Sequence, residues 1–476
     1  MDILPFRRML MHRMDTDTIV APATVPGSGA ISIVRISGPR ALEAVSAVVS
    51  FSRPLNDAPG YSIRYGTALQ NDGSVLDEVL VSVFRAPHSY TGEEAAEISC
   101  HASRYVVETL LQRLCDAGAR AAEPGEFTRR AFVNGKMDLA QAEAVADVIQ
   151  SDNAAAHRVA MNQLRGGYSS RLKELRDKLL EVTALMELEL DFSEEDVEFA
   201  DRNHLVSLVE ETLAHIRTLT DSFRLGNAIK TGIPVAIVGA TNTGKSTLLN
   251  ALLGEDRAIV SDIAGTTRDT VEETFNINGT VFRLIDTAGI RETEEEIEKI
   301  GISRSLLKLS QADIVLGVID ATAPLSEQRQ HIQEIASRIR FNEQTLLLLL
   351  NKMDLVAEPS SPEDTRVTDG KMVTIPLSAK TGQGLETLKN CLVTVWEKRL
   401  KGSEQALLVT NIRHYNALHK AADALELVKA GIASGTPTDL VSQDMRDSLY
   451  HLGSILGTIT DDEILGRIFE RFCIGK

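Results

Sequence analysis

The sequence predicts a multidomain protein with an N-terminal α+β domain, an all-α helical domain, and an α/β domain inserted into the helical one. Up to about Thr128, short apolar runs alternate with Gly and Pro, which is typical of strands and turns. Apolar residues recur at helical spacing from Asp138 to about Leu225 and again after Lys401, whereas residues 230–396 alternate apolar strands with helices. Because the ends of an inserted domain lie close together, this order favours one interrupted helical domain. The predicted parts are an N-terminal extension (1–14), the α+β domain (15–132), two helical parts (133–229 and 399–476) and the inserted domain (230–398).

The composition is that of an acidic globular protein. The 476 residues are 43% hydrophobic and 25% charged, and 50 Lys and Arg against 67 Asp and Glu leave a net charge of −17. This length suits about three domains. A negative net charge disfavours non-specific binding of nucleic acid, so an RNA substrate would need a local basic surface or a partner protein.

The sequence shows no secretory signal and no membrane span. The apolar run Leu346–Leu350 is too short to cross a bilayer. Residues 1–14 carry Arg7, Arg8 and Arg13 but lack a long apolar stretch. They suit a short organellar presequence, a disordered lead-in or an over-extended start, since Met14 would serve as well. The cysteines have no Cys-x-x-Cys spacing, which favours reduced thiols in a cytoplasmic protein; they are Cys100, Cys115, Cys391 and Cys473.

Several elements of the first two domains can be placed individually. Ile31–Ile36 and Val79–Phe84 are β-rich runs and predict strands. A helix is expected from Ser103 to Ala117, ended by Gly118. In the helical segment acidic residues cluster between Glu187 and Asp201, where we favour a solvated face over a metal site.

The most specific motif is Gly239-Ala-Thr-Asn-Thr-Gly-Lys-Ser246. It follows the apolar run Ile233–Val238 and leads into the helix-forming Thr247–Leu253. A strand that delivers a Gly-rich loop to a helix N-terminus forms a phosphate-binding loop, because free N–H groups and the helix dipole attract phosphate. Lys245 is expected to reach the β- and γ-phosphate oxygens, and the Ser246 hydroxyl to bind Mg²⁺.

The next elements have the order of GTPase switches. The polar segment Ser261–Asp269 lies where a GTPase has its first switch, and Thr267 would close on Mg²⁺ when a γ-phosphate is present. Residues 273–285 predict a hairpin with an Asn-Gly turn, which suits positive φ at both central positions. Asp286-Thr-Ala-Gly289 ends its second strand, where the aspartate would hold the Mg²⁺ shell and the Gly289 N–H would meet the γ-phosphate.

Two later motifs predict recognition of guanine. Ile314–Ile319 and Leu346–Leu350 are expected to be buried strands, and the second delivers Asn351-Lys-Met-Asp354. A carboxylate there can accept hydrogen bonds from both N1–H and the 2-amino group of guanine, whereas adenine offers no such donor pair. Ser378-Ala-Lys380 follows the predicted strand Met372–Leu377 and would close over the base.

One position departs from Ras-like GTPases, which place a water-orienting glutamine directly after the Asp-x-x-Gly element. That position is Ile290, which cannot orient water, so hydrolysis must recruit another group; the acidic run from Glu292 to Glu298 lies just downstream. No arginine finger is evident from the sequence, and Arg268 and Arg291 are candidates for structural roles. Asn242 would help to bind a monovalent cation in the place of a guanidinium.

Together these residues resemble the MnmE (TrmE) family of tRNA-modification GTPases, over nearly the whole chain apart from about the first 14 residues. The resemblance rests on the GTP-binding motifs and on Asp17–Ala21, Ser89–Glu93, Pro124–Glu143 and the C-terminal Cys473-Ile-Gly-Lys476. It implies an N-terminal tetrahydrofolate-binding and dimerisation domain, a helical domain and an inserted Ras-like P-loop G domain.

The resemblance also implies partners and a reaction. Family members work with MnmG (GidA), an FAD- and NADH-using protein, in a heterotetramer or larger complex that provides most of the tRNA contact. They add an aminomethyl or carboxymethylaminomethyl group to carbon 5 of the wobble uridine (U34) of certain tRNAs. The methylene carbon comes from 5,10-methylenetetrahydrofolate or a related folate. Their G domains pair across a homodimer in a K⁺-dependent way when GTP is hydrolysed.

Roles are implied for the matching positions. Mg²⁺ would be bound by Ser246 and Thr267, and K⁺ by Asn242, Ser261, Ile263 (through its carbonyl) and Thr266; the family commonly has threonine where this chain has Ser261. Glu298 would position the water and act with Lys245 in catalysis. The folate would contact Arg35, Glu97, Lys136 and Lys476. The other predicted GTP-binding residues are Thr243, Gly244, Thr247, Asp262, Ala264, Gly265, Asp286, Thr287, Ala288, Gly289, Asn351, Lys352, Asp354, Ser378, Ala379 and Lys380.

Two alternatives stay open at this point. Cys473 is either a catalytic nucleophile or acid near the folate, or a small apolar residue that closes the last helix after Phe472. The whole chain is either a modification GTPase or a ribosome-assembly switch of the Era or EngA type. The second class requires an RNA-binding module or tandem G domains, and this chain has one phosphate loop and no Gly-x-x-Gly clamp in a basic helical context. A third reading is a non-enzymatic GTP-gated scaffold, which would bind the nucleotide without turnover.

Overall fold

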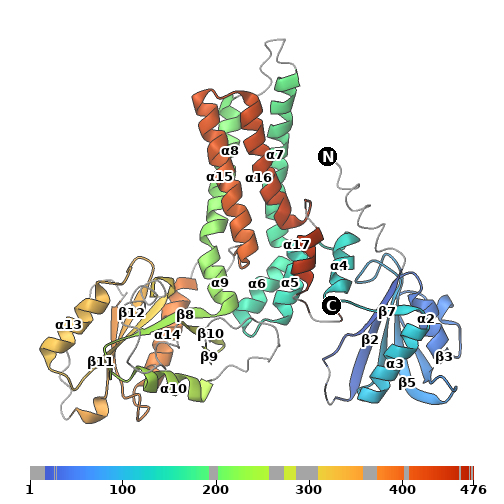
Figure 1. Ribbon diagram of the computed structural model, residues 1–476, viewed down its shortest axis with the longest axis horizontal. Helices are drawn as coiled ribbons and strands as arrows, with labels where there is room; N and C mark the ends of the chain where they lie inside the picture. Colours follow the sequence, from blue (N-terminus) through green and yellow to red (C-terminus); the bar gives the residue numbers. More distant parts are fainter. Residues whose placement is uncertain are drawn as a thin grey trace. The chain divides into compact units, whose positions relative to one another are not determined.

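The computed structural model describes residues 17–25, 27, 29–191, 202–256, 273–285, 309–356, 372–400, 407–459, 462–470, 472 and 475. The chain forms two compact units (Figure 1). The first comprises residues 1–149, 160–216 and 416–476, and the second comprises residues 150–159 and 217–415. Together the two units contain the predicted α+β, helical and α/β parts.

The first unit begins with a seven-stranded sheet in the order β3-β4-β5-β6-β2-β1-β7. Neighbouring strands are antiparallel except β1 and β7, which are parallel. The strands at the two ends of the sheet, β3 and β7, have three residues each. The bounds are β1 Thr18–Pro22, β2 Ile31–Ser37, β3 Val49–Phe51, β4 Ser62–Leu69, β5 Val75–Phe84, β6 Ala95–His101 and β7 Ala119–Ala121.

Alternating side chains give this sheet one buried and one open face. Val79, Val81 and Val83 of β5 are buried, whereas Leu80 between them is 48% exposed. The buried face packs against α2 (Ala41–Val48) and α3 (Arg104–Asp116), which lie side by side along it (Figure 1). The prediction of α3 is confirmed; it begins after Ser103 and ends before Gly118, whose φ of 99° suits the turn that follows the helix.

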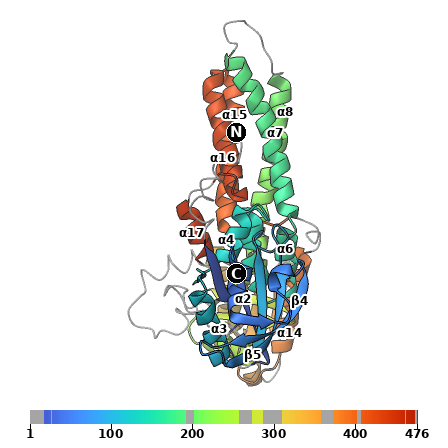
Figure 2. The same ribbon diagram turned by 90° about the vertical axis from the view of Figure 1, so that its right-hand side faces the viewer.

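The rest of the first unit is helical. Its helices are α4 Glu126–Val133, α5 Leu139–Ile149, α7 Gly167–Asp191, α8 Arg202–Asp221, α15 Ile412–Ser434, α16 Thr438–Leu456 and α17 Asp462–Phe469, and α6 (Ala154–Leu164) and the ends of α8 and α15 extend into the second unit. The long helices α7, α8, α15 and α16 run side by side (Figure 2). Phe132, Leu139 and Phe469 share a buried cluster that joins α4 and α5 to α17. The predicted acidic cluster lies outside the residues whose side chains are described.

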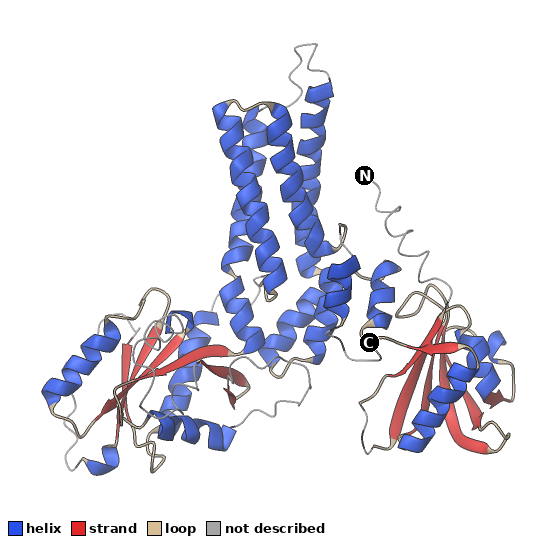
Figure 3. Ribbon diagram, viewed as in Figure 1, coloured by secondary structure: helices blue, strands red, loops and turns tan. Residues whose placement is uncertain are grey.

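The second unit is built on a six-stranded sheet in the order β13-β12-β11-β8-β10-β9, in which only β9 and β10 are antiparallel (Figure 3). Asn278 and Gly279 have φ values of 51° and 81°, which confirms the predicted hairpin turn. The strands are β8 Ile233–Val238, β9 Glu273–Ile277, β10 Thr280–Ile285, β11 Ile314–Asp320, β12 Thr345–Asn351 and β13 Met372–Pro376. The helices are α9 Phe223–Thr231, α10 Lys245–Asp256, α13 Leu325–Ala336 and α14 Leu385–Leu400, with a 3₁₀ turn at Met353–Leu355.

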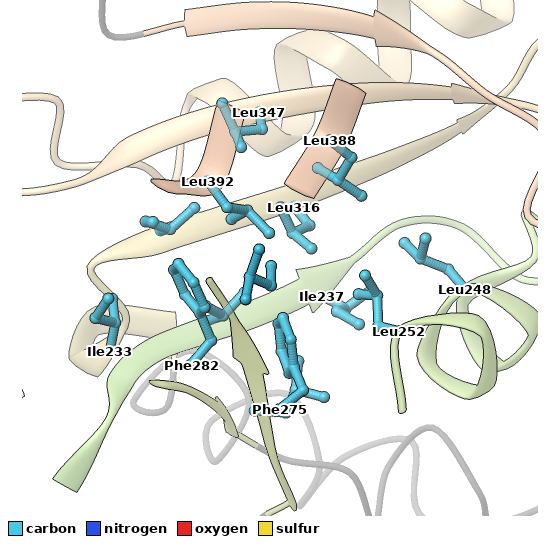
Figure 4. Close-up of a cluster of buried hydrophobic side chains, with 14 of the residues drawn as sticks. Ile233, Ile237, Leu248, Leu252, Phe275, Phe282, Leu316, Leu347, Leu388 and Leu392 are labelled. Atoms are coloured by element: carbon cyan, nitrogen blue, oxygen red, sulfur yellow. The ribbon is translucent and has the colours of Figure 1, made fainter. Parts of the chain in front are cut away.

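Helices cover both faces of this sheet, which explains the continuous apolar runs of its strands. On one face, Leu316 and Leu347 pack with Leu248 of α10 and Leu388 of α14 (Figure 4). The other face carries Leu348 and packs against α13. Since the strands are parallel, the carboxyl ends of β8, β11, β12 and β13 lie at one edge of the sheet, where ligands bind in such folds.

In the described ranges no helix is long and apolar enough to cross a membrane. The three cysteines for which a state is described, Cys100, Cys115 and Cys391, are free thiols, as expected.

Candidate functional site

The predicted phosphate-binding loop joins β8 to α10 at the carboxyl edge of the second sheet. Asn242 and Gly244 have φ values of 61° and 94°, so the backbone curls back on itself in this loop. A Cβ atom on Gly239 would collide with the Val318 carbonyl and lie 3.0 Å from Thr243 Oγ1. The loop therefore lies close against the neighbouring strand β11, and its N–H groups surround a space suited to an anion.

Lys245, the first residue of α10, folds its side chain over this loop. Its Nζ donates hydrogen bonds to the carbonyl oxygens of Gly239 (3.0 Å) and Ala240 (2.7 Å). The ammonium group thus lies beside the loop, at the place where phosphate oxygens would compete for it. Ser246 follows in the first helical turn with an exposed side chain, and a hydroxyl oxygen is a suitable ligand for a hard cation such as Mg²⁺. Within the described ranges, His, Cys, Asp and Glu form no cluster of three or more that could hold a metal.

Asn351 joins three of the predicted motifs. It is the last residue of β12 and is 3% exposed. Its Nδ2 donates to the Thr243 carbonyl (2.8 Å), and its Oδ1 accepts from the Ala379 N–H (2.9 Å). A Cβ atom on Gly244 would collide with this amide, so glycine is required there for steric as well as conformational reasons. The phosphate loop, the Asn-Lys-x-Asp motif and the Ser-Ala-Lys motif are therefore one connected structure.

The side chains predicted to bind the base are also held by neighbours. Ser378 Oγ donates to Asp354 Oδ1 at 2.6 Å, which orients the carboxylate. Lys352, with a φ of 67°, places its Nζ 2.6 Å from Asp320 Oδ2 at the end of β11. Burial alone would raise the pKa of Asp320, but the hydrogen bonds from Lys352 and Thr322 lower it overall. Asp320 therefore stays ionised and fixes Lys352.

Several predicted site residues lie outside the described part of the chain. These are Ser261, Asp262, Ile263, Ala264, Gly265, Thr266, Thr267, Asp286, Thr287, Ala288, Gly289, Glu298, Cys473 and Lys476. Their assigned roles stay predictions. Thr247, which follows the phosphate loop, and Lys380, the last residue of the Ser-Ala-Lys motif, are described, and both side chains are exposed.

A second candidate site is a cavity of about 130 Å³ on the open face of the N-terminal sheet. Arg35 of β2 and Glu97 of β6 are register partners, and the Arg35 Nε and Nη2 atoms lie 2.9 and 2.8 Å from Glu97 Oε1. The Arg35 guanidinium also lies 5.5 and 5.7 Å from the ring centres of Tyr90 and Phe127. The cavity is lined by Arg35, Ser37, Phe84, Tyr90, Thr91, Ala95, Glu97 and Phe127. Aromatic walls around a charged pair suit a flat, polar heterocycle.

The other predicted folate residues lie differently. Lys136 is not among the lining residues; its Nζ donates to the Pro87 carbonyl at 2.9 Å, at the start of the loop that carries Tyr90. Arg35 Nη1 donates to the Gly475 carbonyl at 3.1 Å, so Gly475 lies beside a residue that lines the cavity. Gly475 also packs so closely on the Pro22 carbonyl that a Cβ atom would collide there.

A buried ionic network behind this cavity was not predicted. Arg130, 2% exposed, pairs with Glu93 (3.1 Å), Asp17 (2.7 Å) and Glu126 (3.1 Å). Glu93 in turn accepts a 2.7 Å hydrogen bond from Ser37, which lines the cavity. Asp17, Glu93 and Glu126 belong to three of the sequence segments that carry the family resemblance. The sequence therefore singled out these segments, but it did not show that their charged side chains pair with one another.

The charges of this network hold each other ionised. Burial raises the pKa of Glu126, but hydrogen bonds from Arg120 and the Glu123 N–H, with the nearby Arg130, lower it overall. For Asp17 the same opposing effect of burial is outweighed by Arg120 and Arg130, so its pKa is lowered too.

A mostly parallel sheet with a phosphate loop after its β8 strand and an Asn-Lys-x-Asp motif that begins at the end of its β12 strand defines a P-loop protein of the GTP-binding class. Residues 139–473 match the family described as the MnmE helical domain, and residues 18–136 match the GTP-binding protein TrmE N-terminus. The chain therefore belongs to the MnmE family.

Known proteins are similar to this chain over their full length. The tRNA modification GTPase MnmE of Parabacteroides distasonis is 48% identical over 464 residues, which cover 96% of this chain and 100% of the relative. The proteins of the same name from Bacteroides thetaiotaomicron and Porphyromonas gingivalis are also 48% identical, covering 97% and 98% of this chain and 100% of each relative. This membership argues against the ribosome-assembly alternative.

Proposed function

We propose that this chain is a GTP hydrolase that acts in tRNA modification, as the names of its relatives state of them. The observation that carries the proposal is the Asn351 bridge, which holds the phosphate loop and both guanine-recognition motifs in one geometry. GTP and Mg²⁺ use follow from the same class of site.

In this function Lys245 leaves the carbonyl oxygens of Gly239 and Ala240 and neutralises the β- and γ-phosphate oxygens. Mg²⁺, when bound, would stabilise charge on the phosphate oxygens, with the Ser246 hydroxyl as one ligand. Asp354, oriented by Ser378, accepts the N1–H and 2-amino protons of guanine. Lys352 is fixed by Asp320 beside the base.

We further propose that K⁺ supplies the positive charge for which no arginine finger is evident. Asn242 is exposed at the tip of the phosphate loop with a φ of 61°, so its side-chain oxygen is free to turn towards a cation. Ser261, Ile263 and Thr266 would complete the site, and Glu298 would position the water. Replacing K⁺ with Na⁺ should slow hydrolysis sharply, and equal rates in both salts would remove this part of the proposal.

For the N-terminal cavity we propose a tetrahydrofolate as ligand. Glu97 would exchange its pairing with Arg35 for the N–H groups of a pterin, while Lys136 and Lys476 suit the glutamyl carboxylates. Cys473 stays a candidate for acid or nucleophile. We also propose a partner of the MnmG flavoprotein type, as the family resemblance implies. A net charge of −17 disfavours tRNA binding by this chain alone, so such a partner would provide much of the tRNA contact.

We propose that two copies associate through the open face of the N-terminal sheet. Ile63, Tyr65 and Leu80 are 63%, 59% and 48% exposed on adjacent strands of that face, and Tyr65 and Leu80 are register partners. The face carries the cavity as well, so a second copy would cover both.

The experiment that tests the function measures two quantities. GTP turnover is measured on the purified full chain, and wobble nucleosides are measured by mass spectrometry in cells that lack the native protein and express this one. Turnover together with restored wobble modification supports the proposal. Binding without turnover would instead indicate a scaffold, and ribosome co-sedimentation with unchanged wobble nucleosides would indicate the ribosome-assembly class.

A further inference from the structure

Asp313 lies at the end of the second sheet opposite the nucleotide site. It directly precedes β11, and its side chain is 3% exposed. Its backbone N–H donates to the Pro234 carbonyl of β8 (2.9 Å), and its carbonyl accepts from the Thr345 N–H of β12 (3.0 Å). Asp313 is therefore tied to the three strands that end at the phosphate loop, at Asp320 and at Asn351.

Two arginines from distant parts of the chain converge on this one carboxylate. Arg224 Nε and Arg399 Nη1 lie 2.7 and 3.1 Å from the same oxygen, Asp313 Oδ1. Arg224 belongs to α9 and Arg399 to α14, so they lie just before and just after the predicted limits of the G domain, 230 and 398. Both also contact Glu343, through its carboxylate and its carbonyl respectively.

Residues 222–226, around Arg224, also contact residues 409–415, which follow Arg399 in the chain after the undescribed residues 401–406. Ser222 Oγ accepts a hydrogen bond from the Val409 N–H at 3.0 Å. The rings of Phe223 and Tyr415 stack with their centres 4.5 Å apart. A Cβ atom on Gly226 would collide with the Val409 carbonyl, so the backbones are in close contact. The segments that enter and leave the G domain thus form one paired stem.

Burying the Asp313 carboxylate between two arginines is not the most stable way to fill this position. Burial raises the pKa of Asp313 overall, although both arginines oppose that effect. An apolar side chain at this buried position would avoid the desolvation of the carboxylate, and buried ion pairs are often no more stabilising than apolar packing. The two ion pairs of Asp313 instead fix the directions of α9 and α14 relative to the strands that bind the nucleotide.

We propose that Arg224, Asp313 and Arg399 are positioning residues that form a clasp, which couples the nucleotide state of the G domain to tRNA modification. Movements of β8, β11 and β12 on GTP turnover reach the clasp because the Asp313 backbone is hydrogen-bonded to β8 and β12 and continues directly into β11. The clasp transmits them to the paired stem, whose chain continues into α8 and α15. This inference rests on the proposed function and adds the route of coupling.

The test uses the full chain with Arg224→Gln, Arg399→Gln, the double variant of both, and the triple variant that adds Asp313→Asn. Arg340→Gln is the matched control. Arg340 also contacts Glu343, at 3.2 Å, but its side chain is 54% exposed and, among the described residues, makes no contact with Asp313. For each variant, kcat and KM for GTP, the melting temperature and the wobble modification per GTP hydrolysed are measured.

We expect the two single variants to keep kcat and KM within about threefold while modification per GTP falls at least about tenfold. The control should keep all values. The triple variant no longer buries an unpaired carboxylate, so its melting temperature should exceed that of the double variant. Its modification per GTP should stay low, which a merely structural role would not explain.

Unchanged modification per GTP in the single and triple variants would overturn the clasp, as would recovery of modification together with stability in the triple variant. A wild-type chain that fails to hydrolyse GTP or to restore modification would refute the proposed function itself. The two failures are therefore distinguishable.

Discussion

The substitution Asn351→Ala tests the nucleotide site most directly. It removes two hydrogen bonds and leaves the Thr243 carbonyl and the Ala379 N–H, on residues that are 3% and 6% exposed, without this partner. A buried polar group that loses its partner costs about 1–3 kcal/mol, so the two together cost about 2–6 kcal/mol. Relaxation of the loop and entry of water reduce this value, and we expect about 3 kcal/mol to appear as lost binding of GDP and GTP.

At about 1.4 kcal/mol for each factor of ten, this loss corresponds to a dissociation constant about 100-fold higher. The assay is a titration with a fluorescent guanine nucleotide on the purified chain, with the melting temperature measured in parallel. Asn390→Ala is the matched control, because Asn390 is exposed on α14. A dissociation constant within about threefold of the wild-type value, in a folded protein, would refute the reasoning.

Lys245→Ala should abolish GTP turnover and wobble modification together; normal modification by this variant would contradict their coupling. Asp354→Asn should shift the preference in nucleotide competition from guanosine towards xanthosine triphosphate, because the amide then pairs with a carbonyl, and an unchanged preference would exclude the base contact. Glu97→Gln removes the carboxylate that is proposed to accept hydrogen bonds from the pterin N–H groups, so calorimetry should show at least about tenfold weaker binding of a tetrahydrofolate; equal affinity would place the ligand elsewhere. Because the pKa values of Asp17 and Glu126 are lowered in the folded protein, their stabilisation is complete above the ordinary values of 3.8 and 4.5 and is lost as the pH falls through the folded-state values. The melting temperature should fall in that range and less steeply in Asp17→Asn, and identical curves would show that the network does not titrate with unfolding.

The elements with strong local signals could be predicted from the sequence. The strand before the phosphate loop, the helix after it, and the Asn278-Gly279 turn were all placed correctly, because each depends on residues close together in the chain. The apolar run at Leu346–Leu350 likewise became a strand buried on both faces. The predicted domain limits and the roles of the switch residues stay predictions.

What the sequence could not provide is the pairing of polar side chains from distant elements. Arg224 and Asp313 are 89 positions apart, and Arg130 and Asp17 are 113 apart. Each of these charges taken alone has the pattern of a surface residue, and only the fold brings its partner to it. The Asn351 bridge could be predicted only in part. The sequence identified the Asn-Lys-x-Asp motif, but the contact of Asn351 with Thr243 depends on the register of the parallel strands.

The two end strands of the N-terminal sheet, β3 and β7, are short, and short end strands disfavour pairing of sheets edge to edge. With three residues each, these end strands offer an incoming chain only a short ladder to extend. Open-ended stacking of strands, the first step towards insoluble aggregates in a crowded cell, is thereby suppressed even though the sheet exposes tyrosine and leucine. The sheet can therefore expose apolar side chains on its open face while its short end strands disfavour polymerisation through strand pairing.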